Sequence, residues 1–331
     1  MSSAQKWNFF AGLFEKYVCA FARHSEKFLR MKDFIVSRLL GGMGNQMFEY
    51  AFARALSLRN GMELYLDACA LDPKRHTRFS LGVFNVSAPF VDAERKSLVI
   101  TPRFELKRRL YKALKIPYRL SPTHLREKSF AFDPSVLSVG NSRYVEGLWQ
   151  SEKYFSDFAD AIRADFAFRD AERLSRHPLF GEVEKPNSVA VHVRRGDYVS
   201  KPKYRRILHV CRKRYYEGAI RHVSERVENA RFFVASDDPK WVRENFGGKN
   251  VVLIEPSGHF EDFYLMSRCR HAVISNSTFS WWSAWLGEAG KPGRITVAPD
   301  MWFAPAANID YSDIIPDRWT KLPTGYGDSA G

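Results

Sequence analysis

The residues best suited to chemistry stand together in the segment His192-Val-Arg-Arg-Gly-Asp-Tyr198, which holds a histidine, two arginines and a carboxylate. Small or apolar residues alternate with polar ones from Val189 to Arg194, so His192 and Arg194 lie on one side of the end of a strand. The planar fork of arginine suits bidentate contact with a diphosphate. An ion-paired strand end, with either arginine bound to Asp197, is the alternative. Polar clusters at a strand's carboxyl end usually form ligand sites, so the segment predicts an anion-binding site.

A second segment, Ile274-Ser-Asn-Ser-Thr-Phe-Ser-Trp-Trp-Ser-Ala-Trp285, leads from a strand into a tryptophan-rich helix. Ser277, Thr278 and their backbone N–H groups are placed to hold phosphate oxygens at the N-terminus of that helix. Ordinary capping by Ser280 is the competing interpretation. The tryptophans recur at helical spacing, so we expect them in the core rather than at a site.

A glycine-rich turn forms the third segment, Leu40-Gly-Gly-Met-Gly-Asn-Gln-Met47, which follows a strand and opens a helix. Glycines let the backbone turn sharply and approach a ligand closely. The segment is neither a phosphate-binding Walker A loop nor a spaced G-x-G-x-x-G fingerprint. A structural turn explains it as well, with Asn45 as the helix cap and Gln46 as the first helical residue.

Three aspartates elsewhere have two interpretations. Asp237 and Asp238 follow another strand, where either of them contacts a ribose or a guanine, or caps the helix that begins at Pro239. Asp262 is interpreted as a helix-start residue rather than as a catalyst.

These segments require strands that alternate with helices. Short apolar runs predict strands at residues 34–40, 62–67, 143–148, 188–194, 231–236, 251–255, 271–275 and 294–298. Helical stretches fall between them, at residues 46–59, 152–165, 213–229, 239–246, 261–268 and 281–287. Such alternation indicates a parallel α/β architecture.

The chain divides into four regions. Residues 31–167 and 188–331 form α/β domains, and residues 168–187 are interpreted as the linker between them. A basic stretch at 94–130 is expected to be an insertion or helical lid. Residues 1–30 form an N-terminal extension in which residues 7–30 are expected to make an amphipathic helix. That helix either docks on the protein's own core or lies on an anionic membrane, and Met31 is a further candidate for the natural start.

Composition narrows the classes of function. The 331 residues include 51 Lys and Arg against 37 Asp and Glu, a formal net charge of +14 that favours an anionic partner. Four scattered cysteines, with no secretory signal or long apolar run, indicate a cytoplasmic protein, peripheral on the inner face of the membrane if residues 7–30 bind there. A nucleic-acid-binding protein is the alternative of a different class. No recognition motif supports it, and we expect no nucleic-acid partner.

The ordered motifs resemble those of the bacterial-type α1,2-fucosyltransferases, glycosyltransferase family eleven. The resemblance covers about residues 33–305. It rests on Gly41-Gly-Met-Gly-Asn-Gln-Met-Phe48, Glu146-Gly-Leu-Trp-Gln-Ser-Glu-Lys-Tyr154, the His192–Tyr198 segment, Asp262 with Leu265-Met266, and Ser275-Asn-Ser-Thr-Phe-Ser-Trp-Trp282.

This resemblance implies a GT-B fold, in which two Rossmann-like domains face a cleft. It implies inverting transfer of fucose from GDP-β-L-fucose to the 2-hydroxyl of a terminal galactose in a lipopolysaccharide, capsule or similar glycan. It also implies that no divalent metal is needed, in keeping with the absence of an Asp-x-Asp motif. The N-terminal domain would bind the acceptor through Asn45 and Gln46. The C-terminal domain would bind GDP-fucose through His192, Arg194, Arg195, Asp237, Asn276, Ser277, Thr278 and Phe279.

The expected mechanism is a single displacement through an oxocarbenium-like transition state. Arg194, Arg195 and the 277–279 loop would stabilise the departing diphosphate. Asp197 is the first candidate for the general base and His192 the second. Enzymes forming α1,6-linked or protein-linked fucose are the nearer alternatives. The Gly-Asp-Tyr continuation of the arginine segment and the Ser-Trp-Trp loop favour the α1,2 linkage.

Overall fold

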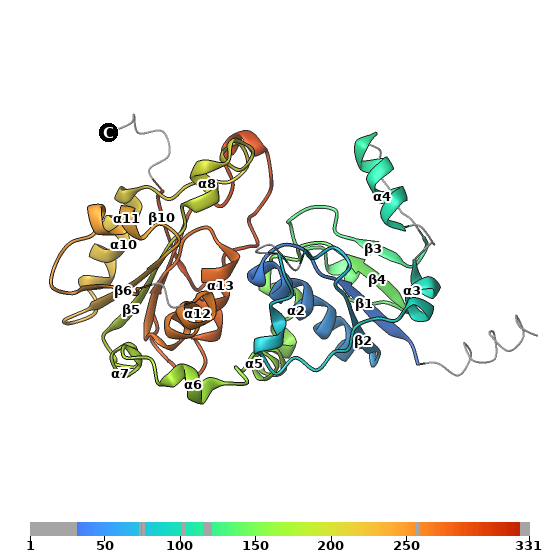
Figure 1. Ribbon diagram of the computed structural model, residues 1–331, viewed down its shortest axis with the longest axis horizontal. Coiled ribbons are helices and arrows are strands. Elements are labelled where there is room, and N and C mark those ends of the chain that lie inside the picture. The colour runs from blue at the N-terminus through green and yellow to red at the C-terminus, as the bar shows by residue number, and fades with distance from the viewer. Residues whose placement is uncertain are drawn as a thin grey trace, which may run out of the picture.

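The structure is a computed structural model, and it describes residues 32–72, 74, 77–100, 104–114, 121–255 and 258–324. The predicted helix at residues 7–30 lies outside this part of the chain. Figure 1 shows two α/β halves side by side, with the strands of each half running between helices. Within the described residues, no helix combines the length and the apolar character needed to cross a bilayer.

The N-terminal half is a four-stranded parallel sheet in the order β2-β1-β4-β3. Its strands are β1 (Phe34–Arg38), β2 (Glu63–Asp67), β3 (His124–Arg126) and β4 (Arg143–Glu146). Helix α2 (Met43–Asn60) follows β1, begins earlier than predicted, and ends at Gly61, whose φ of 63° is the left-handed conformation that stops a helix. Helices α3 (Ala93–Val99) and α4 (Phe104–Ala113) occupy the basic stretch.

The C-terminal half is a six-stranded parallel sheet in the order β7-β6-β5-β8-β9-β10. Its strands are β5 (Ser188–Val193), β6 (Arg231–Ser236), β7 (Val251–Leu253), β8 (His271–Val273), β9 (Thr296–Pro299) and β10 (Thr320–Leu322). The order reverses between β5 and β8, as in doubly wound nucleotide-binding sheets, where ligands bind at the carboxyl ends of the strands beside this reversal. All eight predicted strands are confirmed, but β3 and β10, each three residues long, were not predicted.

Helices cover both halves, and several differ from the prediction. The stretch 152–165 is broken into two 3-10 turns, Glu152–Tyr154 and Ser156–Phe158, before α5 (Ala159–Asp165). Residues 168–187 contain α6 (Ala171–Ser175) and α7 (Phe180–Val183), and Val183 is packed into the core of the C-terminal half. The remaining helices are α8 (Gly196–Ser200), α9 (Pro202–Arg205), α10 (Lys213–Ser224), α11 (Pro239–Asn245), α12 (His259–Arg268) and α13 (Thr278–Leu286).

The two halves share one hydrophobic core. The tryptophans of α13 are fully buried, as predicted, and Trp281 packs on Phe48 of α2 at a ring-centroid distance of 4.5 Å. Trp282 stacks on Phe155 of the N-terminal half at 5.3 Å. Burying aromatic rings of this size from both sides holds the halves together.

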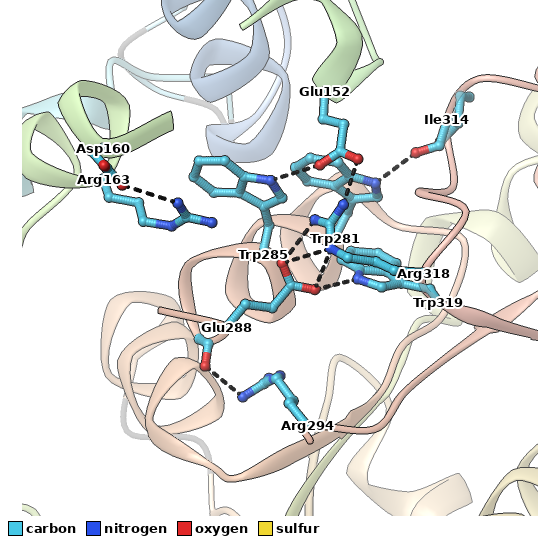
Figure 2. A network of polar contacts seen from close by, with 11 residues as sticks. Glu152, Asp160, Arg163, Trp281, Trp285, Glu288, Arg294, Ile314, Arg318 and Trp319 are labelled. Atoms are coloured by element: carbon cyan, nitrogen blue, oxygen red, sulfur yellow. Dashed lines mark hydrogen bonds and ion pairs between the residues drawn. The ribbon is translucent and has the colours of Figure 1, made fainter. Parts of the chain in front are cut away.

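A polar network surrounds these tryptophans (Figure 2). Glu152 of the N-terminal half accepts a hydrogen bond from Trp285 Nε1 at 3.1 Å and forms an ion pair with Arg318. Arg318 also binds Glu288 at 2.8 Å, and Trp281 Nε1 donates to the carbonyl of Ile314 at 2.7 Å. The network ties α13 and the C-terminal segment to the N-terminal half.

Candidate active-site cleft

A cleft of about 830 Å³ lies between the halves, beside the strand-order reversal of the C-terminal sheet. The N-terminal half contributes the Gly41–Asn45 turn and residues of the 74–80 loop. The C-terminal half contributes residues that follow β5, β6 and β8, together with His259 and Asp262 of α12. A cleft of this size is large enough for a nucleotide sugar or a comparable ligand.

His192 is the next-to-last residue of β5, and its ring lines the cleft. Its Nδ1 lies 2.8 Å from Oγ of Ser275, which follows β8, so the contact spans the strand-order reversal. Burial, reinforced by the positive charge of Arg194, lowers the pKa of His192 to about 3. The imidazole is therefore neutral near pH 7 and can orient a ligand by hydrogen bonding, but it is too weak a base to take a proton readily.

Arg194 points into the cleft, where two carboxylates hold its guanidinium. It binds Asp197 at 2.5 Å and Asp237 at 2.9 Å, and all three side chains line the cleft. Gly196 lets these groups approach each other, because a Cβ at this position would lie 2.4 Å from Oδ2 of Asp237. This ion pairing is the structural alternative that the sequence left open. It also holds the Asp197 carboxylate against Arg194.

Arg195 lies elsewhere, although the sequence analysis grouped it with Arg194. Its guanidinium contacts Asp238 at 3.3 Å and stacks over the ring of Trp241 at 4.4 Å. Its side chain is not part of the cleft wall, whereas its backbone N–H donates to Asp237. Strand β5 ends at Val193 and Arg195 is the residue before α8, so the chain turns at the two arginines and their side chains separate.

The N-terminus of α13 lines the cleft together with Arg194. Residues Ser277, Thr278 and Phe279 line the cleft, and the side chain of Ser277, the residue before the helix, makes no capping hydrogen bond. The N–H groups of the first turn therefore have no side-chain acceptor from this cap, and the positive end of the helix dipole favours an anion there. Ser280, the predicted cap, lies within the helix.

The N-terminal half meets this helix closely. Asn45 Oδ1 accepts a hydrogen bond from Oγ1 of Thr278 at 3.1 Å and another from Gln150 at 3.2 Å. A Cβ on Gly44 would lie 2.5 Å from the backbone carbon of Thr278, so only glycine fits at this approach. The helix cap of α2 is Gly42 rather than Asn45, which leaves the Asn45 side chain at the cleft.

Gln46 and Asn276, both predicted to contact ligands, are buried and act as internal braces. Gln46 donates to the carbonyls of Gly41 and Arg78 and accepts from the N–H of Ser80. Asn276 donates to the carbonyls of His209 and Trp302 at 2.7 and 2.9 Å. Neither side chain lines the cleft, so each one acts by holding cleft-lining loops in place.

Asp238, the second aspartate of its segment, caps α11 by accepting from the N–H of Trp241 at 3.1 Å. Asp237, as described, faces the cleft. Asp238 therefore has the capping role predicted for this segment, whereas Asp237 pairs with Arg194 in the cleft wall, and its contact with a ribose or a guanine stays a prediction.

Asp262 is the main residue that sequence reasoning missed. It lines the cleft from the first turn of α12, and its buried Oδ1 has no hydrogen-bond partner among the described residues. Burial, with a smaller contribution from Glu261, raises the pKa of Asp262 to about 7. A carboxylic acid that titrates near neutral pH in a cleft is suited to general acid–base chemistry. The sequence gives no signal of this, because a carboxylate in a first helical turn is common.

Two cations of the N-terminal half, Lys74 and Arg78, also line the cleft. Arg78 lies close enough to His259 of α12 to lower the pKa of that histidine, after the larger effect of burial. Cations therefore line the cleft from both halves, Arg194 on one side and these two residues on the other, although Asp197 and Asp237 offset the charge of Arg194. In the described part of the chain, no group of His, Cys, Asp and Glu side chains is arranged to hold a metal ion.

Comparison with known sequences gives consistent matches. A family model described as "Glycosyl transferase family 11" matches residues 10–322. An α-1,2-colitosyltransferase of Escherichia coli is 34% identical over 295 residues, covering 87% of this chain and 98% of that protein. The O-antigen biosynthesis glycosyltransferase WbnK of Escherichia coli is 29% identical, covering 86% and 99%. A galactoside α-(1,2)-fucosyltransferase 1 of Ateles belzebuth is 30% identical, covering 74% of this chain and 63% of that protein.

Solved structures agree on the fold. The structure of an Arabidopsis thaliana FUT1 mutant in complex with GDP matches with a TM-score of 0.50 at 11% identity, covering 84% of this chain and 73% of that one. At this identity the likeness shows the GT-B type of α/β fold and nothing finer.

Proposed function

The chain belongs to glycosyl transferase family 11, and from this premise we propose that it transfers L-fucose from GDP-β-L-fucose to the 2-hydroxyl of a terminal galactose, with inversion. The proposal rests mainly on one group of residues at the strand-order reversal, which we call the anion cradle. It consists of Arg194, neutral His192 and the N-terminus of α13, which meet in one cleft. The full-length match to α1,2-linking enzymes supports the linkage.

In this proposal the cradle holds the diphosphate of the donor. Arg194 and the first-turn N–H groups of α13 face the oxygens on which negative charge grows as the bond to fucose breaks. Preorganised donors and charges at such a position stabilise the transition state. Lys74 and Arg78 add positive charge from the N-terminal half. Arg195 supports the turn through its backbone contact with Asp237, and its guanidinium is not needed for the diphosphate.

Asp262 replaces Asp197 as our candidate for the general base. The acceptor oxygen attacks C1 of fucose, the bond from C1 to the diphosphate oxygen breaks, and the hydroxyl proton passes to the Asp262 carboxylate. Asp262 lines the cleft and has a buried oxygen without a hydrogen-bond partner among the described residues, while Asp197 is ion-paired with Arg194. His192, with a pKa of about 3, orients a bound group instead of taking the proton.

The acceptor lies on the N-terminal side of the cleft in this account. Asn45 contacts it directly, and Gln46 acts through the loops that it braces. We propose a galactose-terminated surface glycan as the acceptor, because one relative is an O-antigen biosynthesis glycosyltransferase. A cytoplasmic location, with residues 7–30 in contact with the inner face of the membrane, is part of the same proposal.

A second donor is favoured by one observation. The α-1,2-colitosyltransferase is 34% identical over nearly its whole length, a higher identity than that of the fucosyltransferase from Ateles belzebuth. Colitose is fucose without its 3-hydroxyl, so the same cradle would accept GDP-colitose, and the choice depends on polar contacts to one hydroxyl.

A competition between donors tests the proposal. The purified protein is incubated with a β-galactoside and equimolar GDP-fucose and GDP-colitose, and the products are separated by mass. We expect the fucosylated product to predominate. Predominant colitosylation would assign the second donor, and failure to use either sugar, with turnover of a UDP-sugar, would contradict the proposed donor class.

A further inference from the structure

Helix α4, residues Phe104–Ala113, stands away from the sheet of the N-terminal half. It projects at one end of this half, beyond the strands β3 and β4 (Figure 1). No residue of this helix lines the cleft, although it is the longest element of the basic stretch at residues 94–130.

Leucines form a stripe along α4. The exposed fractions are 64% for Leu106, 56% for Leu110 and 57% for Leu114. The N–H of Leu114 donates to the carbonyl of Leu110 at 3.0 Å, so the helical turn continues to Leu114. Residues four apart lie on one face of a helix, and these three account for much of the large apolar side-chain surface exposed in the described chain. Contiguous exposed apolar surface of this kind indicates an interaction site.

The stripe faces away from the protein. Arg108 lies on the opposite side of the helix from these leucines, at about 100° per residue. Arg108 and Tyr111 are half-buried, whereas Lys107 and Arg109 are exposed. At about 100° per residue, Lys107 and Arg109 flank the leucine stripe on its two sides.

We propose that α4 binds the surface of an anionic lipid bilayer. The leucine stripe inserts among the acyl chains near the headgroups, and Lys107 and Arg109 contact the lipid phosphates on either side. An apolar stripe flanked by cations is the pattern of interfacial helices. The helix carries Lys107, Arg108, Arg109 and Lys112 against Glu105 alone, so its charge complements an anionic surface.

Two other occupants of the stripe are disfavoured by charge. A second copy of α4 would bring two basic helices together. The segment 7–30 also has an excess of basic residues, with Lys16, Arg23, Lys27 and Arg30 against Glu15 and Glu26. Either contact would place like charges side by side, whereas the bilayer offers the opposite charge.

The proposal has a consequence for the acceptor. Because α4 belongs to the half that we propose to bind the acceptor, the contact would bring this side of the cleft close to glycans carried on membrane lipids. It is separate from the contact proposed for residues 7–30, and it does not depend on which sugar is transferred.

Vesicle sedimentation with the full-length protein tests the proposal. The vesicles contain phosphatidylglycerol and phosphatidylcholine, or phosphatidylcholine alone. The Leu106→Gln/Leu110→Gln/Leu114→Gln variant should bind anionic vesicles at least about a hundredfold more weakly than the wild type, since apolar insertion is lost at three positions. The matched control is Phe90→Gln, an equally exposed apolar residue of the same half that should leave binding unchanged.

A second variant and two further measurements complete the test. Lys107→Glu/Arg109→Glu keeps the stripe and should weaken the preference for anionic vesicles, and added salt should weaken wild-type binding. Both variants should keep wild-type transfer to a soluble acceptor, which shows that they fold. Undiminished vesicle binding by the leucine variant would overturn the proposal. So would a wild-type dimer in lipid-free ultracentrifugation that the leucine substitutions dissociate, because the stripe would then be an interface between copies.

Discussion

Replacing Asp262 with Asn gives the sharpest test of the proposed chemistry. The substitution keeps the shape of the side chain and removes its ability to accept a proton. A general base typically contributes 10²- to 10⁴-fold, so kcat should fall by about that factor while the KM for the donor changes little. Glu261→Gln is the matched control, because Glu261 is the adjacent carboxylate and forms an ion pair with Arg173 away from the cleft.

The pH profile of the wild type adds a quantitative check. With a pKa of about 7, Asp262 is ionised to about 90% at pH 8 and to about 10% at pH 6, so kcat/KM should fall about tenfold between these values. The profile is recorded under initial-rate conditions with a soluble β-galactoside. In Asp262→Asn this acidic limb should disappear from the residual activity.

The Asp262→Asn variant should be more stable than the wild type, although it is less active. The raised pKa means that the folded protein holds the ionised Asp262 at a cost relative to the unfolded chain at pH 8. Allowing for partial solvent exposure, the Asn variant should gain about 2 kcal/mol in its free energy of unfolding. Urea unfolding at pH 8 measures this. A variant that keeps its turnover would refute the base assignment, and one that loses both activity and stability would indicate a structural role.

Four other substitutions test the remaining parts of the site. Arg194→Gln should lower kcat/KM by at least about a hundredfold, whereas Arg195→Gln should lower it by less than about tenfold; equal losses in donor kinetics would contradict the division between the two arginines. Gly44→Ala should cost about 1–3 kcal/mol in thermal unfolding because its Cβ meets the backbone of Thr278, and an unchanged Tm would show that the halves separate easily. Between pH 7.5 and 5, His192→Asn should gain about 2 kcal/mol relative to wild type, because only the wild-type histidine takes up a proton on unfolding; a difference independent of pH in urea titrations would refute its low pKa.

Much of the fold follows from local pattern. All eight predicted strands form, since apolar runs bounded by turns identify buried parallel strands well. The missed strands β3 and β10 are too short to show periodicity. Helices α6 and α7, of five and four residues, are also too short to show a helical period, so the sequence analysis interpreted their region as a linker. Residues 152–165 have a helical composition, but the structure divides them into two 3-10 turns and α5, with Phe155 buried between the turns.

The site was only partly predictable, because several of its residues depend on contacts with parts of the chain that are distant in the sequence. Strand alternation placed His192 and Arg194 on one side, and the structure brings both to the cleft. Arg195, which was grouped with them by residue type alone, lies beyond the strand at the start of α8 and points elsewhere. Gln46 carried no sign of its role, since its partners lie at positions 41, 78 and 80. The pKa of Asp262 depends on burial by the assembled halves, which no local pattern encodes.

The leucines of α4 were visible in the sequence. Leu106, Leu110 and Leu114 recur every four residues, a spacing typical of one helix face, but the sequence analysis treated residues 94–130 only as an insertion or helical lid. What the sequence does not give is the side of the helix that the protein covers. That depends on the tertiary structure, which leaves Leu106, Leu110 and Leu114 exposed and half-buries Arg108 and Tyr111.

The central claim is that this cleft joins fucose to the 2-hydroxyl of galactose with inversion. The most direct measurement is two-dimensional NMR of the disaccharide product made from GDP-β-L-fucose and a β-galactoside. The account predicts a single new α-anomeric signal whose through-bond correlation connects C1 of fucose to C2 of galactose. A β-anomeric signal, or a correlation to another galactose carbon, would contradict it.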